Sequence, residues 1–318
     1  MIRTFRSTDA AAWIACWNQA MPQDGISERI FLNRVLTDVN FDREGVLVAE
    51  EGGRIVGGLI AVVRSTPMMG TDLEPESGWI TAFFVHPDYR RRGIGHALLE
   101  AADKYFLARG RQQIYFASYA PNYFVPGLDR AQYPIAAHLL ESHGFRTLYQ
   151  AVAMDKNLVG FAIPDEVRDL EARRRGEGYL VEPLTLPFVA AVLEFTQREF
   201  DPDWTRAIRE AIKAGVPMSH TLIARRQDVV VGFALYGGYD GVAERFGPFG
   251  VASSLRGTGL GKILLYRCLE QMRQEGLHGA WFLWTGENEP AGHLYRRAGF
   301  SVTRRFDIMK KTLTARHP

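Results

Sequence analysis

The chain has 318 residues, of which 47% are hydrophobic and 23% are charged. This length predicts two domains of ordinary size, each able to bury its own core. Thirty-eight basic and thirty-six acidic residues leave a formal net charge of +2, so we expect neither nucleic acid nor an anionic membrane as a partner.

The cysteines and the apolar segments exclude further classes of protein. Cys16 and Cys268 are isolated in expected helices, which is neither a disulfide framework nor a metal site. The first 21 residues lack the uninterrupted apolar core of a signal peptide, and no apolar run is long enough to span a bilayer. We therefore expect a cytoplasmic protein that binds no metal and exists as a monomer or homodimer.

The first half is predicted to begin with a strand and a helical region, followed by three strands. The expected strands are "IRTF" at 2–5, "GVLVAEE" at 45–51, "RIVGGLIAVV" at 54–63 and "GWITAFFV" at 78–85, and the helices fall within 8–37. The turn "EGG" at 51–53 has the composition of a β-hairpin connection.

A glycine-rich loop, "RRRGIG" at 90–95, follows the strand at 78–85. Apolar residues then recur at helical spacing from Ile94 to Tyr105, and Gly110 is placed to end the helix as a left-handed cap. The aromatic run "QIYFASY" at 113–119 predicts a buried strand after that helix.

The second half repeats this order. A charged stretch at 164–178 predicts a linker helix; the expected strands are "YLVEPL" at 179–184, "HTLIARR" at 220–226, "VVVGFALYGGY" at 229–239 and "RFGPFGV" at 245–251, and the expected helices lie near 187–199 and 203–214. The hairpin turn is "RQD" at 226–228.

The glycine loop returns as "RGTGLG" at 256–261, and Gly276 follows its helix at the spacing of Gly110. The segment "HGF" at 143–145 has its counterpart in "AGF" at 298–300. Agreement in this order indicates a tandem duplication. The predicted organisation is an N-terminal domain at 1–160, a linker helix within 161–178 and a C-terminal domain at 179–318.

Two loops distinguish the halves. "PMMGTDLEPE" at 67–76 and "APNYFVPGLDRAQ" at 120–132 are longer in the first half. Loops rich in proline, glycine and aromatic residues often line binding clefts. A surface excursion without a role is the equal alternative.

A glycine-rich turn between a strand and a helix suits a phosphate. It presents free backbone N–H groups at the positive end of the helix macrodipole, and glycine lets a ligand approach the backbone closely. Two other phosphate loops are excluded: Ile263 follows Lys262 where a P-loop has Ser or Thr, and "GTGLGK" lacks the last glycine spacing of a dinucleotide fingerprint.

Together these motifs resemble one family. The pattern R-x-x-G-x-G/A between a strand and a helix is similar to the acyl-CoA pyrophosphate loop of the GNAT N-acyltransferases. "NEPAGHLYRRAGF" at 288–300 resembles that family's N-x-x-A-x-x-L-Y-x-x-x-G-F segment. The resemblance covers both halves apart from the linker. It implies an α/β (α+β) fold of two tandem GNAT-like domains, each a mixed central sheet flanked by helices.

The resemblance also implies acetyl-CoA as co-substrate and the residues that would bind it. They are Val251, Arg256, Gly257, Thr258, Gly259, Leu260, Gly261, Lys262 and Asn288 in the second half, and Val85, Arg90, Arg91, Gly93, Ile94 and Gly95 in the first. Asn288 is also a candidate N-cap of the following helix.

Acyl transfer from a thioester to an amine needs three groups. The amine must lose a proton, the tetrahedral oxyanion needs a donor, and the leaving thiolate must be stabilised. The resemblance implies direct attack in a ternary complex, with Tyr295 protonating the thiolate, and a phenol with a pKa of about 10 suits that task. The alternative for Tyr295 is ring packing beneath the cofactor. The resemblance also places a bulge at Pro248, which frees a backbone N–H near Val251 for the thioester carbonyl; a plain irregularity of the strand is the equal alternative.

Glu244 is the candidate general base, at a position where some family members carry a glutamate. Its alternative is a solvated charge at the end of a strand. Glu199, Asp201 and Asp203 are weaker candidates between two helices, where the acceptor often binds in the family.

The first half lacks the tyrosine. Aligning "HGF" with "AGF" puts Leu140 opposite Tyr295 and Tyr133 opposite Asn288. The first half then either binds acyl-CoA without turnover or uses another residue, such as Tyr123 or Tyr133.

We expect one working site and one bound acetyl-CoA, in the second half. The expected activity is transfer of an acetyl group from acetyl-CoA to a primary amine of a small molecule or peptide. A catalytically silent acyl-CoA-binding protein and an enzyme for a longer acyl chain are the alternatives.

Overall fold

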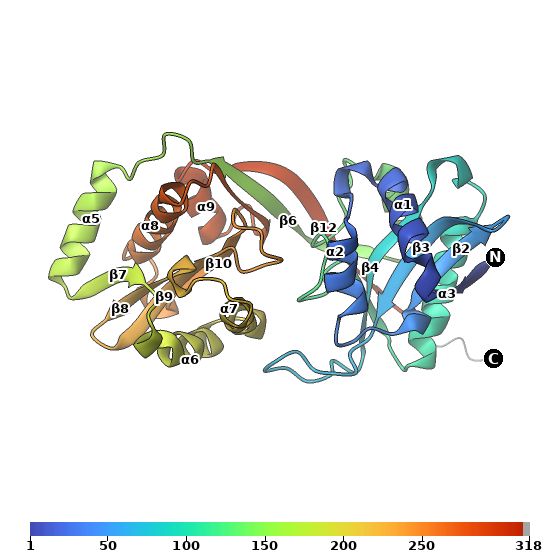
Figure 1. Ribbon diagram of the computed structural model, residues 1–318, viewed down its shortest axis with the longest axis horizontal. Helices are drawn as coiled ribbons and strands as arrows, with labels where there is room; N and C mark the ends of the chain where they lie inside the picture. The colour runs from blue at the N-terminus through green and yellow to red at the C-terminus, as the bar shows by residue number, and fades with distance from the viewer. Residues whose placement is uncertain (314–318) are drawn as a thin grey trace. The chain divides into compact units, whose positions relative to one another are not determined.

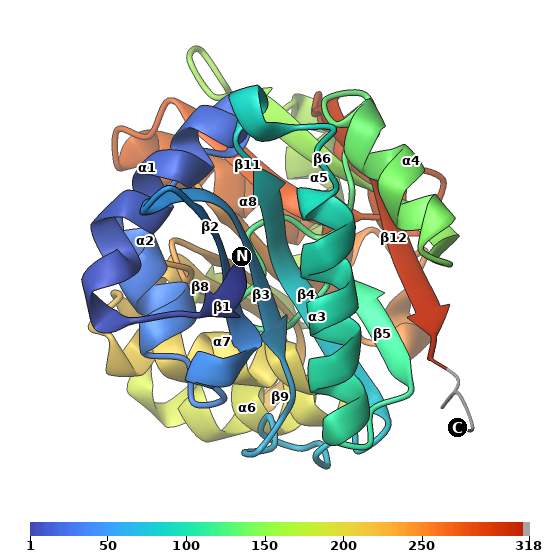
Figure 2. The ribbon, with the colours of Figure 1, turned by 90° about the vertical axis from the view of Figure 1, so that its right-hand side faces the viewer.

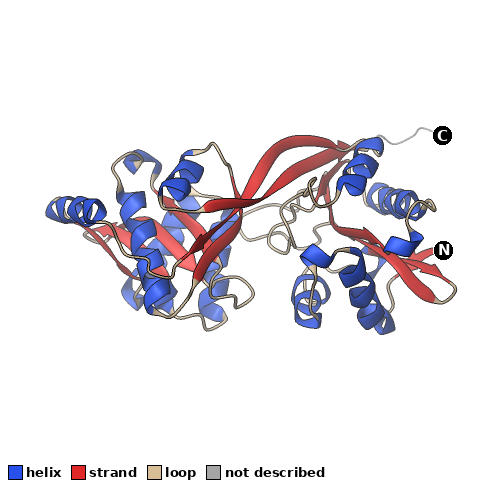
Figure 3. Ribbon diagram, turned by 90° about the horizontal axis from the view of Figure 1, so that it is seen from above, coloured by secondary structure: helices blue, strands red, loops and turns tan. Residues whose placement is uncertain are grey.

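The structure, a computed structural model, describes residues 1–313. The chain divides into two compact units. Unit 1 comprises Met1–Val152 and the described residues from Arg304 onward, and unit 2 comprises Ala153–Thr303. Each unit combines β-strands with flanking helices, as predicted (Figures 1 and 3).

Unit 1 contains a mixed sheet in the order β1-β2-β3-β4-β5-β12. Its strands are β1 (Ile2–Thr4), β2 (Val46–Glu51), β3 (Arg54–Val62), β4 (Ser77–Val85) and β5 (Gln113–Phe116), with the larger part of β12 (Ser301–Thr312) and the start of β6 (Arg146–Asn157). Its helices are α1 (Ala10–Ala20), α2 (Glu28–Phe31), α3 (Ile94–Ala108) and α4 (Pro134–Ser142). Among the pairs β1-β2, β2-β3, β3-β4, β4-β5 and β5-β12, only β4 and β5 run parallel.

Side chains alternate along β2 between two buried clusters. Leu47 belongs to the same cluster as Leu98 of α3, whereas Val48 belongs to the same cluster as Trp13 of α1. Because successive residues of a strand point to opposite faces, α3 and α1 cover opposite sides of the sheet. Figure 2 shows α3 crossing the near face of these strands.

β5 pairs along its whole length with the start of β4. Ser77–Ile80 lies beside Gln113–Phe116 in parallel register. At Ala117 the backbone takes a left-handed φ of 65° and the strand ends. Thr81–Val85 of β4 therefore continues past the end of β5.

Unit 2 contains a four-stranded sheet in the order β10-β9-β8-β7. Its elements are α5 (Asp165–Gly176), β7 (Tyr179–Pro183), α6 (Val189–Glu199), α7 (Pro202–Lys213), β8 (Thr221–Arg226), β9 (Val229–Tyr236), β10 (Phe246–Val251), α8 (Leu260–Gln274), β11 (Gly279–Thr285) and α9 (Pro290–Arg297), together with the end of β6. A parallel bridge between Arg245 and Trp281 links the turn before β10 to β11.

Several local predictions are confirmed. The predicted linker helix is α5, and Gly110 and Gly276 follow their helices with left-handed φ values of 70° and 85°. At Pro248, where a bulge or a plain irregularity was expected, the register of β10 against β9 shifts between Phe246 and Phe249.

The C-terminal boundary differs from the sequence prediction. Residues 179–318 were expected to form one domain, whereas the described residues from Arg304 onward belong to unit 1. Strand pairing is the reason, since Met309–Thr312 of β12 lies antiparallel to Gln113–Phe116 of β5. The end of β6, from Ala153, belongs to unit 2.

Candidate functional site

The two glycine loops share a backbone conformation. Gly93 and Gly259 are the N-caps of α3 and α8, with φ values of 79° and 87°. Two residues earlier, Arg91 and Gly257 are also left-handed, with φ values of 60° and 81°. Both loops thus lead into a helix whose first N–H groups have no intrahelical acceptor, as a phosphate cradle requires.

A cavity of about 940 Å3 lies at the first loop. All six residues predicted there line it: Val85, Arg90, Arg91, Gly93, Ile94 and Gly95. Its walls include Thr81–Val85 of β4 and Phe116 at the end of β5. The cavity therefore lies beside the part of β4 that extends beyond the end of β5.

The loop at 120–132 supplies one side of this cavity. Its contributions are Phe124, Val125, Gly127, Leu128, Asp129 and Gln132. Of the two roles considered for this loop, the geometry favours the lining of a binding cleft.

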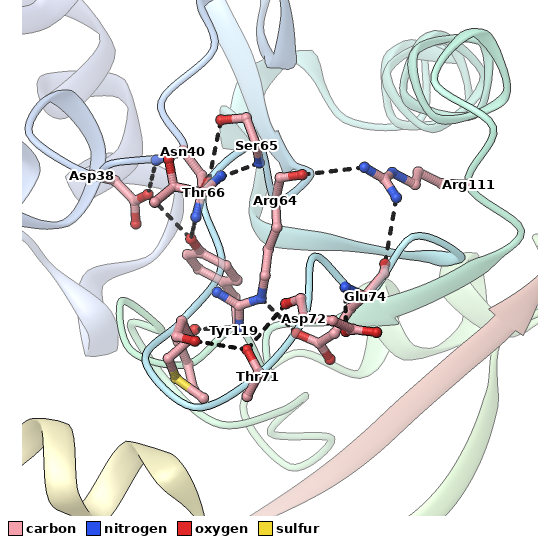
Figure 4. Close-up of polar contacts among 12 residues, drawn as sticks. Asp38, Asn40, Arg64, Ser65, Thr66, Thr71, Asp72, Glu74, Arg111 and Tyr119 are labelled. Atoms are coloured by element: carbon pink, nitrogen blue, oxygen red, sulfur yellow. Dashed lines mark hydrogen bonds and ion pairs between the residues drawn. The ribbon is translucent and has the colours of Figure 1, made fainter.

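The other long loop, 67–76, is held by a different polar network (Figure 4). Arg64 pairs with Glu74 and stacks on the rings of Trp79 and Tyr119, and Arg111 donates to the carbonyl oxygens of Glu74 and Arg64. Of the described residues that line the cavity, none comes from this loop.

Two aspartates form one part of the cavity wall, and one arginine binds both of them. Asp24 and Asp129 line the cavity, and both are bound by Arg304 of β12. The hydroxyl of Tyr133, another lining residue, donates to Asp24 Oδ2 over 2.6 Å. Sequence reasoning named Tyr133 but missed the other three residues, since no local motif marks an ion pair between residues 280 positions apart.

Tyr133 is a weaker acid than free tyrosine. Burial of its side chain, followed by its hydrogen bond to Asp24, raises the pKa of the Tyr133 hydroxyl. The phenol therefore keeps its proton throughout the neutral range and acts as a hydrogen-bond donor.

The arginines of the first loop have different roles. Arg90 braces the fold, since its Nε donates to the Val85 carbonyl over 3.1 Å and its Nη2 to the Ala20 carbonyl over 3.0 Å. Arg91 is exposed at the cavity, and within residues 1–313 its guanidinium has no ion-pair or hydrogen-bond partner. Arg91 is thus the cation of this loop that is available to an anionic ligand.

The second loop is covered on one side by α5. A Cβ atom placed on Gly259 would lie 2.7 Å from Cδ2 of Leu170, whereas one on Gly93 would meet no atom within 4 Å. Arg174 Nε donates to the Thr258 carbonyl over 2.8 Å, and Lys262 pairs with Glu166 over 2.6 Å. Helix α5 therefore binds the Thr258 carbonyl and the Lys262 ammonium and covers Gly259 on one side.

Tyr295 lies in an aromatic cluster of unit 2. Its ring centre is 4.5 Å from that of Phe282 and 6.0 Å from that of Phe249, and the residue is 7% exposed. Burial raises the pKa of the Tyr295 hydroxyl. Among the described residues, none hydrogen-bonds this hydroxyl. The ring therefore packs among aromatic side chains, as in the ring-packing alternative, while its protonated hydroxyl is also what the predicted acid requires.

Aromatic side chains also cover the end of β10. A Cβ atom on Gly250 would lie 2.5 Å from Cζ of Phe200, and the Phe200 ring stacks on Trp204 with centroids 4.6 Å apart. Val251, predicted to supply the donor for the thioester carbonyl, ends this strand beside the start of α8, its Cγ1 being 3.8 Å from a Cβ built on Gly261.

Two further predicted residues of the second half, Glu244 and Asn288, lie in turns. Glu244 is half-buried in the turn before β10, where its carbonyl accepts the Trp281 N–H. Asn288 is exposed. The N-cap role predicted for Asn288 is wrong, because α9 begins at Pro290 and its N-cap is Glu289.

The weaker candidates for a base hold the local fold together. Glu199 accepts hydrogen bonds from the N–H and hydroxyl of Ser253, which lower the pKa of its carboxyl group. Asp201 caps α7, and Asp203 pairs with Arg206 over 2.8 Å.

Residues 1–313 contain no group of three or more His, Cys, Asp or Glu side chains placed to hold a metal ion. Within that range, no helix is long and apolar enough to cross a membrane.

A family model described as the acetyltransferase (GNAT) family matches residues 3–145 and again residues 189–300. The chain belongs to the GNAT family. The two matches agree with the repeated loops, so the protein is an acyltransferase with two tandem GNAT regions.

Known GNAT proteins resemble the chain along most of its length. The mycothiol acetyltransferase of Saccharomonospora viridis is 27% identical over 240 residues, which cover 70% of this chain and 71% of that protein. A glucosamine N-acetyltransferase region of a fungal multi-domain GH3 β-N-acetylglucosaminidase superposes with a TM-score of 0.81 at 19% identity, over 98% of this chain and 38% of that one. A tandem GNAT protein from the clavulanic acid biosynthesis pathway gives a TM-score of 0.64 at 16% identity, over 98% of both chains. The two structural matches show the fold alone.

Proposed function

We propose that this GNAT enzyme transfers the acetyl group of acetyl-CoA to a primary amine, and that the reaction takes place in the cavity of unit 1. The supporting observation is the contrast between the loops. The first opens into a cavity of about 940 Å3, a size suited to a small-molecule site. The second is covered on one side, where Leu170 lies against Gly259 and Arg174 binds the Thr258 carbonyl. The assignment of Tyr295 stays a prediction that this geometry does not favour.

The first loop fits the pyrophosphate of acetyl-CoA. The N–H groups that begin α3 at Ile94 and Gly95 lie at the positive end of the helix macrodipole. Arg91 can add a charge-assisted contact. When bound, acetyl-CoA supplies the acyl group and a thiolate leaving group.

Asp24 and Tyr133 are the candidate groups on the acceptor side. The carboxylate of Asp24 suits a substrate ammonium, and the hydroxyl of Tyr133 is a donor held on that carboxylate. An ammonium bound to Asp24 would share the carboxylate with the Tyr133 hydroxyl, which Asp24 keeps in place until the thiolate forms and accepts its hydrogen bond. In the reaction one ammonium proton passes to water, the C–N bond forms, the thioester C–S bond breaks, and a second proton of the amine is transferred to the thiolate, so that coenzyme A leaves as a thiol.

A matched pair of charge reversals tests which loop binds the donor. Arg91→Glu and Arg256→Glu each place one carboxylate at an exposed loop position. We expect Arg91→Glu to raise the KM for acetyl-CoA by about tenfold or more, because like charges repel, and Arg256→Glu to change it by less than about twofold. Steady-state kinetics with D-glucosamine, tyramine, spermidine, lysine and a peptide with a free N-terminus would supply the rates. A large effect of Arg256→Glu alone would return the site to the second half.

The matched tyrosine variants test the chemistry. Tyr133→Phe should lower kcat by about a hundredfold, in the range of positioned acid–base groups. Tyr295→Phe should leave kcat within about twofold, since Tyr295 belongs to unit 2 and the proposed reaction takes place in the cavity of unit 1. Equal melting curves for both variants would show that the fold is intact. Loss of turnover in Tyr295→Phe but not in Tyr133→Phe would refute the proposed site.

A further inference from the structure

Arg304 binds two carboxylates of the unit 1 cavity with all three guanidinium nitrogens. Its Nη1 lies 2.6 Å from Asp24 Oδ1, and its Nη2 lies 3.1 Å from Asp24 Oδ2. Its Nε lies 2.7 Å from Asp129 Oδ2. A planar fork of this kind fixes both the position and the rotation of the carboxylate it binds.

The three charged side chains of this contact are largely shielded from water. The side chains of Asp24 and Asp129 are 10% and 4% exposed, and that of Arg304 is 22% exposed. Two carboxylates with so little water around them would repel each other unless a cation lay between them. Arg304 also packs over the Phe306 ring, with its Cζ 4.8 Å from the ring centre.

Hydrogen bonds connect Arg304 through Asp24 to the hydroxyl of Tyr133. Asp24 Oδ2 accepts both Arg304 Nη2 and the Tyr133 hydroxyl. Loss of Arg304 would leave Asp24 free to rotate, and the hydroxyl would lose its fixed acceptor. The backbone carbonyl of Asp24 is held separately, by the Trp17 indole N–H over 2.7 Å, so the loop itself would stay in place.

We propose that Arg304 is a positioning residue of the unit 1 site, which orients Asp24 and, through it, the hydroxyl of Tyr133. This inference rests on the proposed function. It means that the site beside the first glycine loop is completed by a residue from the last strand of the chain.

Substitutions at Arg304 test this role. Arg304→Gln removes the charge, and Arg304→Lys keeps it on a single ammonium that cannot hold both carboxylates in the same geometry. Arg305→Gln is the matched control, because it lies next along β12 and points to the opposite face. We expect Arg304→Gln to lower kcat/KM for the amine by about tenfold or more, with Arg304→Lys intermediate and Arg305→Gln near the native value. The dissociation constant for acetyl-CoA, measured calorimetrically, should change by less than about twofold.

A double-mutant cycle separates positioning from a merely structural role. In a Tyr133→Phe background, Arg304→Gln should cost clearly less in kcat/KM than in the native background, because the hydroxyl is already gone and only the orientation of Asp24 toward the ammonium remains to be lost. The same loss in both backgrounds would overturn the inference, as would a loss in Arg304→Lys that follows the fraction unfolded. Arg91→Glu tells the two proposals apart. If it leaves the KM for acetyl-CoA unchanged, the proposed function fails and Arg304 loses its role with it, whereas a raised KM with an additive cycle removes the Arg304 inference alone.

Discussion

At the scale of single residues, Arg91 has a left-handed backbone conformation. The equivalent residue of the second loop is a glycine, Gly257. Arg91 has φ 60° where the second loop has Gly257 at φ 81°. A residue with a side chain costs about 1–2 kcal/mol in the left-handed region. Such strain collects at functional sites, and here it brings an exposed guanidinium to the cavity.

Arg91→Gly should therefore separate stability from binding. We expect the free energy of unfolding to rise by roughly 0.5–1 kcal/mol, since relief of strain is partly offset by the greater freedom of glycine in the unfolded chain. Affinity for acetyl-CoA should fall by about tenfold through loss of a charged contact. Urea denaturation and calorimetry measure the two effects. A variant that is less stable but binds normally would contradict this account.

At the scale of elements, α5 belongs to unit 2, where it forms ion pairs with α8. Glu171 binds Arg267 over 2.7 Å, and Glu166 binds Lys262 over 2.6 Å, both on α8. Leu170 covers Gly259. The sequence suggested a linker because this stretch is charged and sparsely apolar, but its charges are paired with α8.

Release of these contacts should uncover the second loop. We expect one acetyl-CoA per native chain and a second, weaker binding event in the double variant Leu170→Ala/Arg174→Ala. The control, Arg173→Ala/Arg175→Ala, changes exposed residues of the same helix and should bind one. Titration calorimetry measures the number of acetyl-CoA molecules bound per chain. Two molecules bound to the native chain would show that α5 does not limit the second loop.

At the scale of the whole molecule, unit 1 is built from both ends of the chain. β12 adds a strand beside β5, and its Phe306 and Met309 side chains are fully buried. Lys311, 4% exposed, pairs with Asp103 of α3. The fold of unit 1, and not only its site, therefore depends on β12.

A chain that ends at Thr303 should lose much of the stability of unit 1. Burial of a large apolar side chain contributes about 1.5–3 kcal/mol, so loss of Phe306 and Met309 removes a large share of a total of about 5–15 kcal/mol. We expect a lower unfolding midpoint and no acetyl-CoA binding at the first loop. A synthetic peptide of residues 301–313 should restore binding, and a scrambled peptide should not. Normal binding by the truncated chain would contradict this role of β12.

Sequence alone determined the family, the duplication and the glycine loops, because each is written in contiguous residues whose spacing sets the local backbone. It could not decide which loop stays open, since that depends on Leu170 reaching Gly259 across some 90 residues. Nor did it indicate that Arg304 binds Asp24, 280 positions away. Motifs report local conformation, whereas exposure and ion pairing between distant residues exist only once the chain is packed. That is why the similarity between "RRRGIG" and "RGTGLG" is a property of the sequence, and the difference between their surroundings is a property of the fold.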